Sequence, residues 1–363
     1  MVVVLDVEGA NASDFTVGTS PLAELLSCLH VLAEPEHHPE SRTWLARTGA
    51  QLTGSFTQEL RYYSPLWARY RCRLFFPLRA PLDRALAQEL DELLRLDLGV
   101  FVPLAADGIR GWGVNPPSEN VLRSSVERHD FVKSCERRSF SRGELANALV
   151  SDPERFRTGL VDTLAHCAEA FFDDEWAKVG PRLTDVAARV RDQLRTAPVS
   201  TVLTSVSPTA TFTQHPARVS YDKLQSARGT VRGRGCLLVP TMRGWPHLIL
   251  KVDEGLLPLV VHFIAGDWEQ QSPVSQRLVR ERLAAIAEPA RFELCRHLLG
   301  EPITTSELAA RMGIGEPQVS RHLRRLREVG LVTSKREGRM VFHRLHAEPL
   351  INLGADVLTT VMR

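Results

Sequence analysis

The clearest hydrophobic periodicity in the chain lies between residues 316 and 329. Val319, Leu323 and Leu326 repeat at i, i+4 and i+7, which predicts a helix with one buried stripe. The opposite positions point away from that stripe, and they carry mostly basic and polar side chains. They are Gln318, Ser320, Arg321, His322, Arg324, Arg325 and Arg327.

A shorter helix is predicted immediately before this one, beginning at Thr305. Thr304, followed three residues later by Glu307, is typical of a capping box, in which each side chain accepts a hydrogen bond from the other's backbone N–H. Gly313 suits the left-handed conformation that ends a helix, and Gly315 takes the N-cap position of the next helix. The pattern therefore predicts a helix-turn-helix.

After Gly330 the pattern changes to that of strands. Residues 331–335 and 340–345 flank a charged tip at residues 336–339 with glycine at the turn, which predicts a β-hairpin. Residues 301–345 hold nine Lys and Arg against five Glu, a net charge of +4, whereas the whole chain is +2 and the remainder is therefore −2. The positive charge is concentrated where a DNA backbone would be met, and the order of elements predicts a winged helix-turn-helix that binds DNA.

The chemistry of the outward side chains indicates how they would contact a duplex. Arginine reads guanine in a bidentate manner and glutamine suits adenine, so we expect base contacts from Gln318, Arg321 and His322. Contacts to phosphates would set affinity without sequence choice. We expect these from Ser320, Arg324, Arg325, Lys335, Arg336 and Arg339.

Residues 280–345 resemble the DNA-binding domain of ArsR-family transcriptional regulators, although MarR-like regulators share the general plan. The matching stretches are LAAIAEPAR at 283–291, SELA at 306–309, VSRHL at 319–323 and LREVGLV at 326–332. The resemblance implies a homodimer that pairs through the first and last helices of the domain and represses from a palindromic operator. It places the dimer contacts at Leu278, Leu283, Leu350, Leu353, Val357 and Leu358.

The sequence departs from the family pattern at two places. Gly315 stands where ArsR-like regulators often have Ser, so one side-chain contact is absent. Metal-sensing members carry cysteines on the helix before the turn, or His/Asp pairs on the last helix. Here residues 305–311 contain no Cys, and the last helix offers only Asp356. Because soft or borderline divalent ions need thiolate or imidazole clusters, we expect no metal and no cofactor.

The preceding part of the chain predicts a larger, mainly helical region, so the fold class is α+β and mostly α. Leucines at helical spacing predict a helix over Pro21–Ala33, and residues 199–265 change to short β-type runs broken by Pro and Gly. These runs suggest a small antiparallel sheet, completed by N-terminal strands at residues 2–7 and 15–17. The expected domains are 1–198, mainly helical; 199–270, β-rich and packed on the first; and 271–363, for DNA binding and dimerisation, with a linker at 266–272.

This order also resembles a subgroup of ArsR-like regulators with a large N-terminal domain of unassigned function. The residues that carry this weaker match are SPLAEL at 20–25, His37-His38-Pro39, and residues 171–176 before Pro181. The match brings no ligand with it.

Three features of this region invite a chemical interpretation. His37 and His38 are adjacent, so their side chains point apart on a helix or strand, and we favour a helix end at the surface over a metal site. Residues 229–235 are glycine-rich but lack the spacing of a phosphate loop, which favours a turn. Residues 61–73 alternate Tyr and Trp with Arg, as single-strand binders do, but helical spacing favours a core position for the aromatics.

Composition limits the cellular setting. The six cysteines are scattered without a CxxC motif, which indicates reduced, buried thiols. The first residues lack the features of a signal peptide, and no apolar run approaches the ~18 residues of a membrane span. We expect a cytoplasmic protein.

Together these patterns predict a sequence-specific transcriptional regulator, a homodimeric repressor whose N-terminal region senses a small-molecule effector or mediates assembly. An architectural DNA-binding protein without an inducer is the first alternative. The second is an enzyme fused to a DNA-binding domain, for which the sequence offers no motif. We expect no enzymatic activity.

Overall fold

The computed structural model divides the chain into two units, Met1–Trp268 and Glu269–Arg363. It describes residues 2–35, 38, 41–68, 71–111, 121–207, 210–223, 226–245, 247–252, 257–265, 275–299, 302–338 and 340–362. The linker expected at 266–272 lies outside these residues. Helices predominate over small sheets, which confirms the α+β, mostly α fold class.

The first unit contains most of the helices. They are α1 (Pro21–Ala33), α2 (Arg42–Gly49), α3 (Gly54–Tyr63), α4 (Leu86–Arg95), α5 (Leu98–Arg110), α6 (Ser125–Glu136), α7 (Phe140–Ser151), α8 (Pro153–Cys167), α9 (Asp173–Thr196) and α10 (Val199–Ser205). The β-type run predicted over residues 201–206 is wrong, because burial of Val202 and Leu203 holds this β-branched stretch as the helix α10.

The described residues of the first unit also form two four-stranded sheets. The first has the order β3-β4-β1-β5 and is built from β1 (Val2–Asp6), β3 (Ala210–Thr213), β4 (Arg218–Asp222) and β5 (Ala227–Thr230). The second has the order β2-β6-β8-β7 and is built from β2 (Phe15–Val17), β6 (Cys236–Thr241), β7 (Ile249–Lys251) and β8 (Leu259–Ile264).

The expectation of one antiparallel sheet is wrong, because the strands form two sheets and some of the neighbouring strands are parallel. Strand β6 runs parallel to β2 and β8, and β1 runs parallel to β5 although it is antiparallel to β4. The physical reason is burial, since every residue of β6 and β8 is buried. Parallel strands covered on both faces have continuous apolar sequences, as these two strands do.

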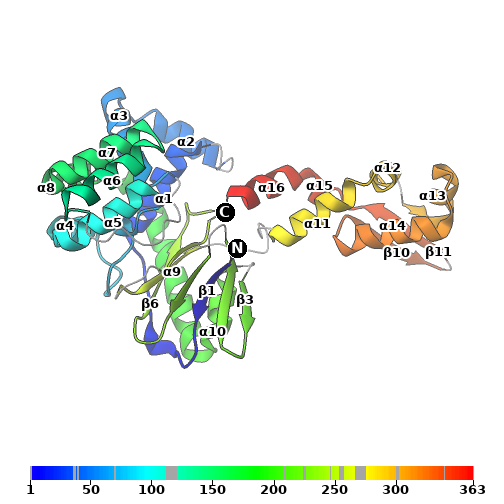
Figure 1. Ribbon diagram of the computed structural model, residues 1–363. Coiled ribbons are helices and arrows are strands. Elements are labelled where there is room, and N and C mark those ends of the chain that lie inside the picture. Colours follow the sequence, from blue (N-terminus) through cyan, green and yellow to red (C-terminus); the bar gives the residue numbers. More distant parts are fainter. Residues whose placement is uncertain are drawn as a thin grey trace. The chain divides into compact units, whose positions relative to one another are not determined.

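Strand β6 separates two hydrophobic cores. Leu237 and Val239 pack with the helices α1–α8, whereas Cys236 and Leu238 pack with α9, α10 and the other sheet. The division follows from the strand period of two, which sends successive side chains to opposite faces. In Figure 1 the helices α2–α8 gather on one side of the sheets of this unit.

Helix α1 is buried along residues 21–31, including polar residues at a spacing of three. The Glu24 carboxylate accepts hydrogen bonds from the Thr241 hydroxyl (2.6 Å) and from the backbone N–H of Met242 (3.2 Å) and Arg243 (2.9 Å). Ser27 bonds the ring of His262 at 3.2 Å. The polar stripe of α1 thus ties the helix to the end of β6 and the loop that follows.

The second unit contains the helices α11 (Gln276–Ile286), α12 (Pro289–His297), α13 (Thr305–Met312), α14 (Glu316–Glu328), α15 (Glu348–Ile351) and α16 (Leu353–Met362). Its sheet has the order β10-β11-β9, with β9 (Ile303–Thr304), β10 (Val332–Glu337) and β11 (Met340–Leu345). All six cysteines are buried thiols outside any disulfide, as expected. Among the described helices, none has the length and apolarity to cross a membrane.

The Glu24 network predicts a pH-dependent stability. Burial raises the pKa of Glu24 to about 6, above its ordinary 4.5, although its hydrogen bonds act in the opposite direction. Between pH 4.5 and 6 the folded chain therefore binds more protons at Glu24 than the unfolded chain does. The contribution of Glu24 to the free energy of unfolding falls as the pH rises through this range. Relative to Glu24→Gln, which does not titrate, the unfolding free energy of the wild type should fall by about 2 kcal/mol between pH 4.5 and 7.

Urea unfolding followed by tryptophan fluorescence checks this prediction. All six Trp lie at or before residue 268, so the signal reports the first unit. The prediction would be contradicted if the free energies of unfolding of the wild type and of Glu24→Gln changed with pH in the same way.

Candidate DNA-binding interface

The turn between α13 and α14 is built by local hydrogen bonds. Helix α13 begins at Thr305 as predicted, and the Thr304 hydroxyl accepts from the Glu307 N–H at 3.4 Å. The reciprocal half of the capping box is replaced, because the Glu307 carboxylate pairs with Arg311. Gly313 ends the helix with φ of 65°, the left-handed conformation expected of it.

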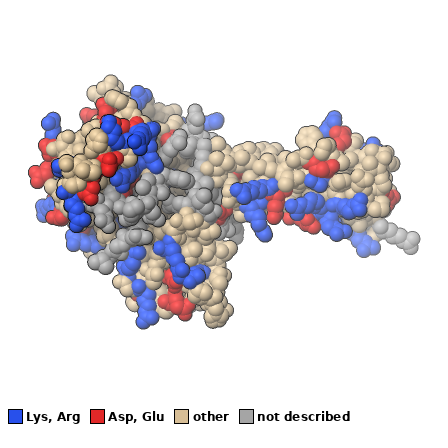
Figure 2. Space-filling model, in the orientation of Figure 1, with Lys and Arg blue, Asp and Glu red and all other residues tan. Residues whose placement is uncertain are grey.

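Helix α14 buries one face and exposes the other. Val319, Leu323 and Leu326 are buried in a core shared with α12, α13 and the start of β10, as the periodicity predicted. The residues exposed on α14 include Gln318, Ser320, Arg321, Arg324 and Arg327, and Arg325 is half-buried. In Figure 2, Lys and Arg gather along the edge of the second unit that α14 and β10 occupy in Figure 1.

His322 does not share this exposure. Its side chain is 14% exposed, and Nδ1 lies 3.6 Å from the carboxylate of Glu288. Glu288 in turn caps α12 by accepting from the N–H groups of Ala290 and Arg291. The expectation that His322 reaches a base edge therefore needs correction, because in this arrangement the ring faces a neighbouring helix.

The hairpin formed by β10 and β11 is the wing, and one of its histidines contacts α13. The buried ring of His343 on β11 bonds the hydroxyl of Thr305 at 3.0 Å and that of Ser334 on β10 at 2.8 Å. Burial lowers the pKa of His343, and the charge of Arg327 lowers it further. Lys335 and Arg336 are exposed on the wing, whereas Arg339 lies outside the described residues.

The first and last helices of the second unit pack together. Arg282 of α11 forms an ion pair with Asp356 of α16 at 3.3 Å, which gives the single acidic residue of the last helix a structural partner. Of the expected dimer residues, Leu353 is buried, while Leu278, Leu350 and Val357 are half-buried. Leu283 and Leu358 are 40% and 42% exposed, beside Ile351 at 79% and Val361 at 66%. An apolar surface thus remains uncovered by the second unit itself.

Two sequence families match the chain. Residues 1–269 match a family described as "Family of unknown function (DUF5937)", and residues 286–335 match one described as "Helix-turn-helix domain". The HTH-type transcriptional regulator NmtR of Mycobacterium tuberculosis is 31% identical over 88 residues, which are 23% of this chain and 73% of that protein. The chain belongs to the DUF5937 family and carries an ArsR-family helix-turn-helix domain.

Other similar proteins match the same C-terminal part. KmtR of Mycobacterium tuberculosis, also named an HTH-type transcriptional regulator, is 33% identical over 81 residues, 22% of this chain and 62% of that protein. A solved homodimeric winged helix-turn-helix DNA-binding domain from Mycobacterium bovis is 24% identical, with a TM-score of 0.21, and the match covers 25% of this chain and 90% of that domain. The chain spans 54–62% of the length of the first three relatives it matches.

The structure of the first unit, the DUF5937 unit, tests the three interpretations made above for residues 61–73, 229–235 and 37–38. Tyr63 and Trp67 are buried in the helical core, as favoured. The turn favoured for residues 229–235 is confirmed at Gly233 and Gly235, which adopt positive φ before β6, but Gly229 and Thr230 belong to strand β5. His37 lies outside the described residues, but His38 is buried and not at the surface as favoured.

Sequence reasoning missed the surroundings of His38, where His30 and His247 meet it. The three residues are far apart in the chain, so no local spacing brings them together. The available signal was the polar spacing of three along α1, since Glu24, Ser27 and His30 interrupt an otherwise apolar helix.

Shortening a side chain in the buried stripe of α14 should destabilise the second unit and leave the stability of the first unit unchanged. Leu323→Ala should destabilise the ArsR-family unit by about 2–5 kcal/mol, because it leaves a cavity under α14. Hydrogen exchange should then show lower protection across residues 305–345, while tryptophan-reported unfolding of residues 1–268 stays unchanged. Arg324→Ala, at an exposed position of the same helix, is the matched control. Equal protection in the two variants would contradict the prediction.

Proposed function

We propose that this protein is a sequence-specific DNA-binding transcriptional regulator that acts as a homodimeric repressor. The observation that carries the proposal is the two-sided character of α14, with a fully buried apolar stripe opposite an exposed row of arginines. A helix of this kind after a tight turn suits insertion into a major groove. The names of the relatives, which include a "Biofilm growth-associated repressor" of Agrobacterium fabrum, support regulation and repression.

The exposed side chains are assigned to two roles. Gln318 and Arg321 are the proposed base readers, because both are exposed near the N-terminal end of α14 and offer bidentate hydrogen bonding. Ser320, Arg324, Arg325, Lys335 and Arg336 are the proposed phosphate contacts, and Arg339 remains a prediction of the same kind. His322 is better suited to fix α14 against α12 through Glu288.

The homodimer is supported by the uncovered apolar surface of α11 and α16. Leu283, Leu358, Ile351 and Val361 lose contact with water only if another surface covers them. A second copy of the same helices would do so with twofold symmetry, which also suits a palindromic operator. The DUF5937 unit is then left for effector binding or for further assembly.

The division between base and phosphate contacts is testable with a duplex selected from a random library by the protein itself. Arg321→Ala should relax preference at one base position, at a cost of ~1–3 kcal/mol. Lys335→Ala should weaken binding to selected and random duplexes alike and reduce the slope of affinity against salt by about one. Arg277→Ala, at an exposed arginine outside α14 and the wing, is the control. Equal losses on both duplexes for Arg321→Ala would overturn the assignment.

The dimer surface is testable without DNA. Leu358→Asp should shift the protein from dimer to monomer in sedimentation equilibrium, because a charge at a packed apolar position is costly to bury. Val126→Asp introduces the same charge at an exposed apolar position of α6 and should leave the dimer intact. A wild type that sediments as a monomer at micromolar concentration would refute the homodimer.

A further inference from the structure

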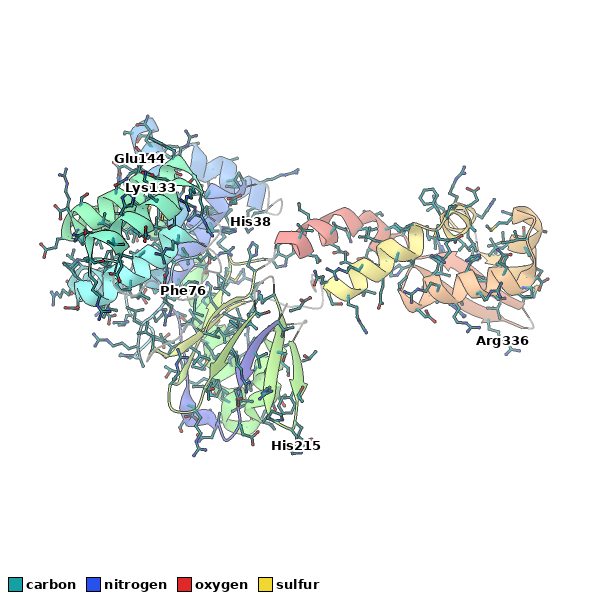
Figure 3. All side chains as sticks on the ribbon, viewed as in Figure 1. His38, Phe76, Lys133, Glu144, His215 and Arg336 are labelled. Atoms are coloured by element: carbon teal, nitrogen blue, oxygen red, sulfur yellow. The ribbon has the colours of Figure 1, made fainter. Side chains whose placement is uncertain are left out.

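Three buried histidines converge in the DUF5937 unit. His30 lies in the last turn of α1, His38 follows that helix, and His247 lies in the loop between β6 and β7. One ring nitrogen from each lies within 4.8 Å of those of the other two. Figure 3 labels His38, which lies close to α1.

The spacing of the rings suits a shared ion. His30 Nε2 and His247 Nε2 are 3.3 Å apart. Two ligands on a tetrahedral zinc ion, with bonds of about 2.1 Å, have nitrogens roughly 3.4 Å apart. The ring centroids are separated by 5.0, 5.1 and 5.6 Å, and three imidazoles around one such ion would have centroids about 5 Å apart.

The hydrogen bonding of His30 orients its ring for coordination. Nδ1 lies 3.2 Å from the carbonyl oxygen of Trp67, so the ring carries its proton on Nδ1 and turns the lone pair of Nε2 toward His247. A ring N–H donated to a backbone carbonyl is the usual support of a metal-bound histidine. Both rings are buried, which disfavours their charged form, and a histidine ligand must be neutral.

The elements that carry His30 and His247 are held in place. Helix α1 is buried along most of its length, and its Glu24 accepts from the backbone N–H groups of Met242 and Arg243. The Arg243 side chain also donates to the Glu175 carboxylate at 2.8 Å, and the backbone N–H of His247 donates to the Gly244 carbonyl at 2.7 Å. Ligands supported in this way need little reorganisation to bind an ion.

We propose that His30, His38 and His247 form a binding site for a divalent transition-metal ion of the zinc class. Imidazole ligands select such ions over Mg²⁺ and Ca²⁺. Three protein ligands leave one tetrahedral position for water or an exogenous group. This proposal departs from the expectation of no metal, and it is independent of the proposed DNA binding because it uses no residue of the second unit.

The experiment uses tag-free, full-length protein, stripped with a chelator and kept reduced. Zn²⁺ is titrated in competition with a chromophoric chelator, and Co²⁺ is added separately as a spectroscopic probe. We expect one equivalent of each ion, with the visible bands of tetrahedral Co²⁺ and without the near-ultraviolet bands of thiolate ligands. Bound Zn²⁺ should also raise the unfolding midpoint that tryptophan fluorescence reports for the first unit.

Variants identify the ligands. His30→Gln, His38→Gln and His247→Gln should each weaken Zn²⁺ binding at least tenfold. His262→Gln removes a buried histidine whose ring bonds Ser27 and the Val239 carbonyl, and His215→Gln removes an exposed one; both should retain binding. If the wild type gives no tetrahedral Co²⁺ spectrum, or if the His215 variant alone loses the ion, the proposal fails. The Co²⁺ spectrum needs no variant, so a variant that does not fold leaves the proposal falsifiable.

Discussion

The first unit depends on one constraint, the burial of a helix that carries polar side chains. Residues 21–31 of α1 are all inside, so every polar group on that helix needs a partner within the protein. Glu24 meets the end of β6, Ser27 meets His262, and His30 meets Trp67 and His247. These contacts fix the helix against the second sheet and fix the loop after β6. The two hydrophobic cores then pack on opposite sides of β6.

The second unit depends instead on apolar periodicity, and the sequence therefore predicts it well. Val319, Leu323 and Leu326 determine which side of α14 is buried, and Gly313 determines where α13 ends. Both follow from local rules of helix geometry and capping. The position of His322 could not be predicted in this way, because it depends on Glu288 at the start of another helix.

The fold of the first unit was harder to predict for the same reason. Apart from β5, the strands were located from β-type runs, but the directions of the N-terminal strands depend on pairings between residues more than two hundred positions apart. Residues 201–205 have a β-like composition and form a helix, because packing of Val202 and Leu203 outweighs local preference. The cluster of His30, His38 and His247 shows most clearly what the sequence alone cannot predict. Its members are separated by up to 217 positions, and only the tertiary structure brings them together.

The pairing of the N-terminal strand has a consequence for biosynthesis. Val3 pairs with Tyr221 on one side and with Ala227 on the other, so β1 has no strand partner until most of the unit has been translated. Contacts of such long separation form slowly, and an unpaired apolar edge invites association with other chains in the meantime. The nascent chain must therefore keep VVVLD sheltered throughout most of its elongation.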